Sequence, residues 1–140
     1  MIKMIKELVL SIAIAWLFGK VLKTIIDWVK EKKISLKVLF YDGGMPSLHT
    51  IAVVSLATGL FLETGFSYWF VISVILALIV INDALNVRWI TQNQSKAINK
   101  LIMDKPGFKK LSEHVGHKPV DVLVGLVIGI VIPVIVYAIL

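Results

Sequence analysis

The sequence GGMPSLHT at residues 43–50 leads directly into an apolar run from Ile51 to Leu62. Two glycines let the backbone pass close to a ligand, and the proline fits the first turn of a helix. Ser47 and His49 then stand at the helix start, beside its unpaired N–H groups and the positive end of its dipole. This stretch predicts either an anion site with a titratable group beside it, or a plain turn before a membrane helix with His49 at the lipid–water boundary.

Three more apolar segments accompany this run, and 58% of the 140 residues are hydrophobic, with a mean hydropathy of +0.89. Each segment is near the ~20 residues that cross a bilayer core, and the second is the shortest. We therefore predict an all-α fold: an integral membrane helical bundle of about four transmembrane helices, in a single domain over residues 1–140. The predicted helices are about Leu8–Val29, Pro46–Leu62, Phe66–Val87 and Val120–Leu140.

The chain has a formal net charge of +6 and no cysteine. The lack of cysteine excludes disulfides, thiolate chemistry and cysteine–zinc sites. No soluble domain is present to offer a basic face, so we expect the bilayer and its anionic headgroups as partners, and no nucleic acid. The first apolar segment runs on past a signal-like stretch, which predicts a retained helix.

Charged residues stand near the ends of two apolar segments, where they are costly and mark functional candidates. Lys20, Lys23 and Asp27 share one helix face, and Asp83 precedes Arg88 at the end of the third segment. Two plainer explanations remain open. Lys23 can pair with Asp27 while Lys20 reaches the interface, and Asp83 can form an interfacial ion pair with Arg88.

His117 and Asp121 are four residues apart at the start of the last segment, so their side chains can meet. A carboxylate on one ring nitrogen fixes the tautomer and makes the other nitrogen a better nucleophile, although helix capping would also explain the pair. Four consecutive membrane helices alternate in direction. We therefore expect the candidates to converge on one side of the membrane: Lys23, Ser47, His49, Arg88, His117 and Asp121.

Residues 89–119 form the one long polar connection. Apolar residues at helical spacing with lysines opposite, at 96–102, predict a short amphipathic helix in the membrane interface. A second short helix is expected from Phe108 to Val115. Small residues on the first and last helices suit close packing with another copy, which predicts a homodimer: Ser11, Ala15, Gly19, Gly125 and Gly129.

Several of these blocks together resemble the divergent branch of the type-2 phosphatidic acid phosphatase superfamily, which is related to acid phosphatases and vanadium-dependent haloperoxidases. The resemblance covers most of the chain. It rests on residues 19–23, 43–50, 83–88 and 116–125, and on Gln94 with Asn99. It implies hydrolysis of a membrane lipid phosphate through a phosphohistidine, with no metal ion or other cofactor.

The resemblance also implies roles for the residues. His117 would attack phosphorus, Asp121 would orient it, and His49 would protonate the leaving alkoxide and then activate water. The phosphoryl oxygens would be held by Lys23, Ser47, Arg88, Gly43 and Gly44, with Lys20 replacing an arginine of the wider superfamily. Expected substrates are phosphatidylglycerophosphate, phosphatidic acid or a polyprenyl phosphate. The alternatives are a transporter subunit and a non-catalytic membrane protein with the same frame.

Positive charge is concentrated on the side of the expected site. The first and third loops carry ten lysines, Lys30, Lys32, Lys33, Lys37, Lys96, Lys100, Lys105, Lys109, Lys110 and Lys118, and the other side carries Lys3 and Lys6. Positive loops stay in the cytoplasm. The sequence therefore predicts a protein of the cytoplasmic membrane whose site faces the cytoplasm and whose termini lie outside, which favours phosphatidylglycerophosphate.

Overall fold

The computed structural model describes residues 2–31, 44–102, 105 and 107–140, and these residues form helices and connecting segments, with no strand. The elements are α1 (Ile2–Glu31), α2 (Leu48–Thr64), α3 (Tyr68–Asn82), the π-helical turn η2 (Asp83–Val87), α4 (Arg88–Ile102) and α5 (Pro119–Ile139). Three stretches are long and apolar enough to cross a membrane, Ile5–Val29, Tyr68–Ile102 and Pro119–Ile139, and α2 is a shorter apolar helix. The predicted all-α membrane bundle is confirmed.

The short helix α2 is the centre of the bundle and contacts α1, α3 and α5. Glycines on α5 allow the closest approach. A Cβ at Gly125 would lie 2.8 Å from the Ser47 carbonyl oxygen, and one at Gly129 would lie 2.8 Å from Val54 Cβ. The start of α2 is therefore held firmly against α5, close to the candidate site.

The small-residue faces that suggested a homodimer pack inside the protomer. Ser11, Ala15 and Gly19 are buried on α1, and a Cβ at Gly19 would lie 3.2 Å from Leu48 Cδ2 on α2. The glycines of α5 face α2 in the same way. The homodimer stays a prediction, and these faces no longer support it.

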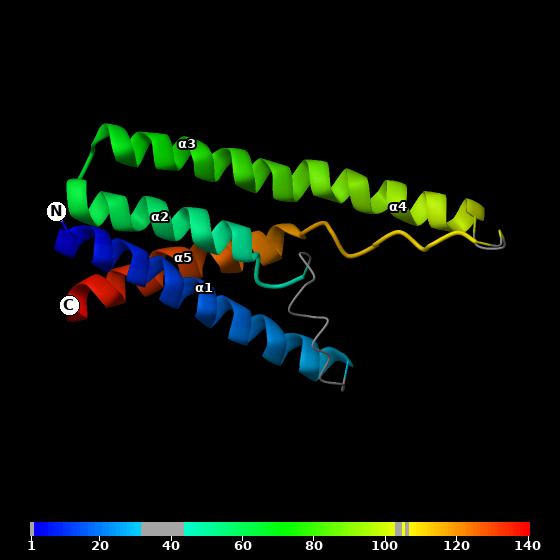
Figure 1. Ribbon diagram of the computed structural model, residues 1–140, viewed down its shortest axis with the longest axis horizontal. Coiled ribbons are helices and arrows are strands. Elements are labelled where there is room, and N and C mark those ends of the chain that lie inside the picture. The colour runs from blue at the N-terminus through cyan, green and yellow to red at the C-terminus, as the bar shows by residue number, and fades with distance from the viewer. Residues whose placement is uncertain (1, 32–43, 103–104, 106) are drawn as a thin grey trace.

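α1, α2, α3 and α5 run in alternating directions, as the sequence predicted, and α4 keeps the direction of α3. Figure 1 shows both termini and the α2–α3 turn at one end of the bundle, with the end of α1 and the starts of α2 and α5 toward the other. Alternation therefore gathers segments that are far apart in the sequence at one end.

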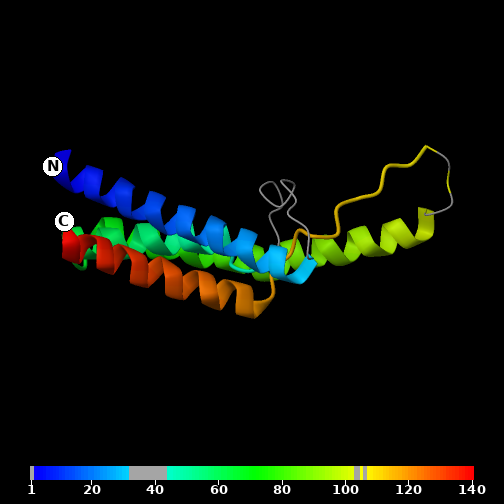
Figure 2. The same cartoon turned by 90° about the horizontal axis from the view of Figure 1, so that it is seen from below.

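The third helix continues past Val87, because η2 joins α3 to α4 without a loop. At 1.5 Å per residue the 35 residues of this rod, 68–102, span about 52 Å, whereas a hydrocarbon core is about 30 Å thick. The amphipathic helix begins at Arg88 instead of residue 96, and it continues the line of α3 beyond the bundle (Figures 1 and 2). We call residues 68–102 the α3–α4 rod.

The predicted helix from Phe108 to Val115 is wrong, because these residues form a non-helical segment that returns beside α4 (Figure 2). Its backbone polar groups bond to side chains of α4. The Leu111 N–H donates to Asn99 Oδ1, and the Leu111 carbonyl accepts from Asn99 Nδ2, both at 2.9 Å. The side chain of Asn99 thus bonds both the N–H and the carbonyl of Leu111, which a helix would have bonded to its own backbone.

Candidate active site

His117 lies just before α5 and its side chain is fully buried. Its Nδ1 lies 4.0 Å from Asp121 Oδ2. Neither ring nitrogen makes a hydrogen bond of good geometry within the described residues, although the backbone of Gly44 is near enough to raise the pKa of the ring. A buried imidazole with both nitrogens in this condition is unusual, because burying a polar group without a partner costs free energy. This imidazole is therefore a candidate for a functional role.

The surroundings of His117 favour its neutral form. Burial lowers its pKa below the usual 6.5, and the Asp121 carboxylate opposes this effect by raising it. Lys23 on α1 and His49 on α2 lower the pKa further. The imidazole is therefore neutral at pH 7, the form that a nucleophile needs.

Asp121 also caps α5, so the plainer explanation weighed from the sequence holds alongside the contact with His117. Its Oδ2 accepts a hydrogen bond from the Lys118 N–H at 2.8 Å. Its backbone carbonyl accepts one from the Ser47 N–H at 3.0 Å, which ties the start of α5 to the start of α2. The two helix starts that carry the histidines are thus bonded directly to each other.

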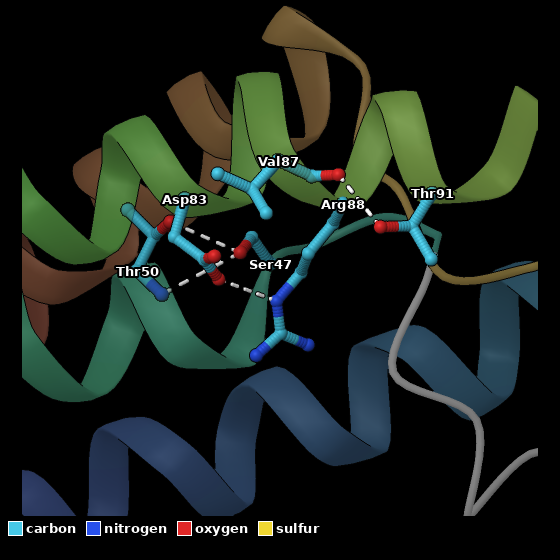
Figure 3. Close-up of polar contacts among 6 residues, drawn as sticks. All are labelled: Ser47, Thr50, Asp83, Val87, Arg88 and Thr91. Carbon is cyan, nitrogen blue, oxygen red and sulfur yellow. Dashed lines mark hydrogen bonds and ion pairs between the residues drawn. The ribbon is translucent and has the colours of Figure 1, made fainter. Parts of the chain in front are cut away.

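Ser47 is the N-cap of α2 and is completely buried. Its Oγ accepts hydrogen bonds from the Thr50 N–H at 3.5 Å and from Thr50 Oγ1 at 3.0 Å (Figure 3). The hydroxyl of Ser47 still has its own proton to donate. The cap fixes the first turn of α2, and with it the position of His49.

Arg88 forms the ion pair with Asp83 that the sequence left open. Arg88 Nε lies 2.7 Å from Asp83 Oδ2. Figure 3 shows both side chains extending from the rod toward the start of α2, where Ser47 and Thr50 lie. The pair places a guanidinium at the same end of the bundle as His117.

The remaining candidates divide into two groups. Lys23 is 2% exposed, and a Cβ built on Gly44 would lie 4.0 Å from Lys23 Cε, so these two residues lie side by side. Lys20, about one turn before Lys23 on α1, instead has its Nζ 4.5 Å from the centre of the Trp16 ring. Gly43 lies outside the described residues.

Two amides of α4 were missed as site residues, although they hold the segment that ends at His117. Gln92 Oε1 accepts from the Gly116 N–H at 3.1 Å, and Asn99 Nδ2 donates to Glu113 Oε1 at 2.7 Å. Gln92, Ser95 and Asn99 form a buried polar face at spacings of three and four. That spacing was the signal in the sequence that could have found them.

The site offers few side chains that could coordinate a metal ion. Within the part of the chain that the structure describes, no group of three His, Asp or Glu side chains gathers in a way that could hold a metal ion. The groups that do converge are imidazoles, a carboxylate and cations, a set suited to binding an anion and moving protons.

The fold and this site define a helical membrane protein with a buried histidine–aspartate pair at one end of the bundle. Residues 4–132 match the Divergent PAP2 family, and the chain belongs to that family, as its resemblance predicted. A protein of Bacillus subtilis (strain 168) named "Uncharacterized membrane protein YuiD" is 36% identical, over 88% of this chain and 89% of its own length. No solved structure is significantly similar to the chain.

Proposed function

We propose that this protein is a membrane-embedded lipid phosphate phosphatase that hydrolyses a phosphomonoester through a phosphohistidine, without a metal ion. The observation that carries the proposal is the buried, neutral His117, with Asp121 at 4.0 Å and the cations Lys23 and Arg88 at the same end of the bundle. A neutral imidazole suits attack on phosphorus, and the cations suit the charge of the phosphate. Membership of a PAP2-related family supports the same chemistry.

The first step forms a P–N bond and breaks the P–O bond to the lipid alcohol. Nδ1 of His117 is on the side of Asp121, so Nε2 is the nitrogen that attacks. His49 gives a proton to the leaving alkoxide, which departs as the alcohol. Lys23 and Arg88 hold the phosphoryl oxygens, with the Ser47 hydroxyl as a further donor.

The second step releases phosphate. Water attacks phosphorus, the P–N bond to His117 breaks, and His49 takes the proton of the water. Inorganic phosphate leaves, and both histidines return to their starting protonation states. His49 therefore serves first as an acid and then as a base. The proton that it gives to the alcohol in the first step is replaced by the proton of water in the second step.

The position of the site at one end of apolar helices supports a lipid substrate. A phosphate at that level sits among headgroups while its hydrocarbon tails stay in the bilayer. The candidates are phosphatidylglycerophosphate, phosphatidic acid and a polyprenyl phosphate. The lysines of α4 and of the segment after it lie toward the site end of the rod, which supports a site that faces the cytoplasm and a substrate made there.

The test is phosphate release by the purified protein from a panel of these three lipid phosphates, with and without vanadate. We expect release from at least one lipid and inhibition by vanadate, which takes the five-coordinate shape of phosphoryl transfer. The control is the His117→Ala protein purified in the same way. A wild-type preparation that releases no more phosphate than this control from any lipid would contradict the proposal.

A further inference from the structure

The π-helical turn η2 changes the carbonyl to which the Arg88 N–H donates. In an α-helix this N–H would bond to the carbonyl four residues earlier, that of Ala84. Here it bonds to the Asp83 carbonyl, five residues earlier. The Ala84 carbonyl instead accepts a hydrogen bond from the His117 N–H at 3.4 Å. A local irregularity of the rod therefore supplies the acceptor for the main chain of His117.

We propose that η2 is a positioning element of the site: the carbonyl that it diverts from the helix ladder fixes the main chain of the nucleophile. The inference rests on the proposed function for the role of His117, but its geometric part stands independently. His117 belongs to the long connection and has no helix of its own to hold it. Its place beside Asp121 depends on how the preceding residues are docked.

The docking is made by backbone contacts. A Cβ on Gly116 would lie 2.9 Å from Trp89 Cα and 3.2 Å from the Arg88 carbonyl oxygen, so the chain lies directly on the rod at this glycine. The Gly116 N–H bonds to Gln92, and the next N–H, that of His117, bonds to Ala84. Two consecutive amides and one glycine thus set the position of the imidazole relative to the rod.

The same turn also determines the position of Arg88, which the proposed function assigns to phosphate binding. Residues five apart are separated by about 140° around an α-helix and cannot pair. The wider π-helical turn brings Asp83 and Arg88 to one side, where Arg88 Nε lies 2.7 Å from Asp83 Oδ2. One extra residue in the rod therefore places both the arginine and the histidine, although a long connection separates them in the sequence.

Deleting Asn86 tests the proposal. Its exposed side chain donates to Asn82 Oδ1 at 2.6 Å, and Asn86→Ala removes the same bond without changing the residue count of the turn. In this variant Trp89 becomes the fourth residue after Ala84, and its N–H takes the Ala84 carbonyl. Asp83 and Arg88 become four apart and can still pair. The deletion thus removes the acceptor of His117 and keeps the ion pair, and it also turns α4, which moves Trp89 and Gln92 relative to α3. The matched control is Asn86→Ala, which keeps the residue count.

Two measurements are made on each protein. We expect the deletion to lower kcat by about a hundredfold with little change in KM, because the nucleophile is misplaced while phosphate binding remains. Hydrogen exchange followed by mass spectrometry should show faster exchange in peptides containing His117. Asn86→Ala should match the wild type in both. A deletion variant with wild-type kcat and exchange, or an equal loss in Asn86→Ala, would overturn the proposal.

Gly116→Ala replaces the deletion if that variant does not fold. Its Cβ would push the chain off Trp89, so we expect the same fall in kcat and the same faster exchange at His117. Wild-type behaviour of Gly116→Ala would also overturn the proposal. If the wild type releases no phosphate at all, the proposed function fails, and the exchange measurement still decides whether η2 positions His117.

Discussion

Arg88 Nε and Asp83 Oδ2 lie 2.7 Å apart across a π-helical turn, with side chains that are 26% and 41% exposed. At such exposure an ion pair contributes only about 0–1 kcal/mol to stability. Its geometric effect is larger, because a carboxylate on Nε holds the planar guanidinium in one orientation. In Figure 3 the terminal nitrogens of Arg88 point away from Asp83. Orientation is therefore the main consequence of this pair.

Removing the charge of Asp83 should therefore affect turnover more than folding. We expect Asp83→Asn to lower kcat/KM by about tenfold, the equivalent of losing one charge-assisted hydrogen bond, with little change in Tm. The matched control is Glu63→Gln, which removes a carboxylate bonded to Tyr137 at the opposite end of the bundle. A kcat/KM for Asp83→Asn equal to that of the control would show that the pair does not serve the site.

The pH dependence should report His117. Burial lowers its pKa below 6.5, so protonation removes activity only as the pH falls below that value. The Asp121 carboxylate raises the pKa, so Asp121→Asn should lower it further and move the acidic limb of kcat/KM to lower pH, while lowering the maximum. The lipid phosphate titrates equally for both proteins. If the acidic limb of kcat/KM moved to higher pH in Asp121→Asn, the pairing of His117 with Asp121 would be contradicted.

Metal removal should leave activity intact. Incubation with excess EDTA followed by a phosphate-release assay should give the untreated rate, because the proposed chemistry uses imidazoles and fixed cations. Vanadate should inhibit the same preparation. Loss of activity in EDTA that magnesium restores would point to a metal mechanism and would assign new roles to the acidic residues.

The orientation in the membrane can be tested with single cysteines, because the chain has no native cysteine. Thr64 is the last residue of α2 and Lys105 follows α4, and both are exposed. The ends of these two helices point in opposite directions along the molecule (Figure 1). In intact cells an impermeant thiol reagent should label Thr64→Cys and spare Lys105→Cys, if the lysine-rich side stays in the cytoplasm. Labelling of Lys105→Cys alone would invert the assignment.

The class of fold was predictable because membrane spans need only length and hydropathy. Four apolar segments predicted the membrane helices. The alternating direction of those helices predicted that the end of the first and the starts of the second and fourth would lie on one side. The π-helical turn was not predictable. Its residues, Asp83 to Val87, carry no pattern that distinguishes an extra residue in the helix from a helix that ends, and we interpreted the polar cluster there as an end.

The sequence predicted the kinds of side chain at the candidate site better than the contacts that hold the segment before His117 in place. Lys23 and His49 both lower the pKa of His117, whereas Lys20 packs on Trp16. The helix expected from Phe108 did not form, because the amide of Asn99 pairs its backbone instead. Such pairings depend on tertiary contacts, which a single sequence does not reveal.

The most direct test of the central claim is to trap the phosphoenzyme. Wild-type protein mixed with lipid labelled in its phosphate and quenched within the first turnover should carry acid-labile, base-stable label. His117→Ala should carry none and should lose activity by at least about 10²-fold, while His114→Ala, three residues away and exposed, should label as the wild type does. Label that persists in His117→Ala, or turnover above about a tenth of the wild-type rate, would contradict a phosphohistidine at His117.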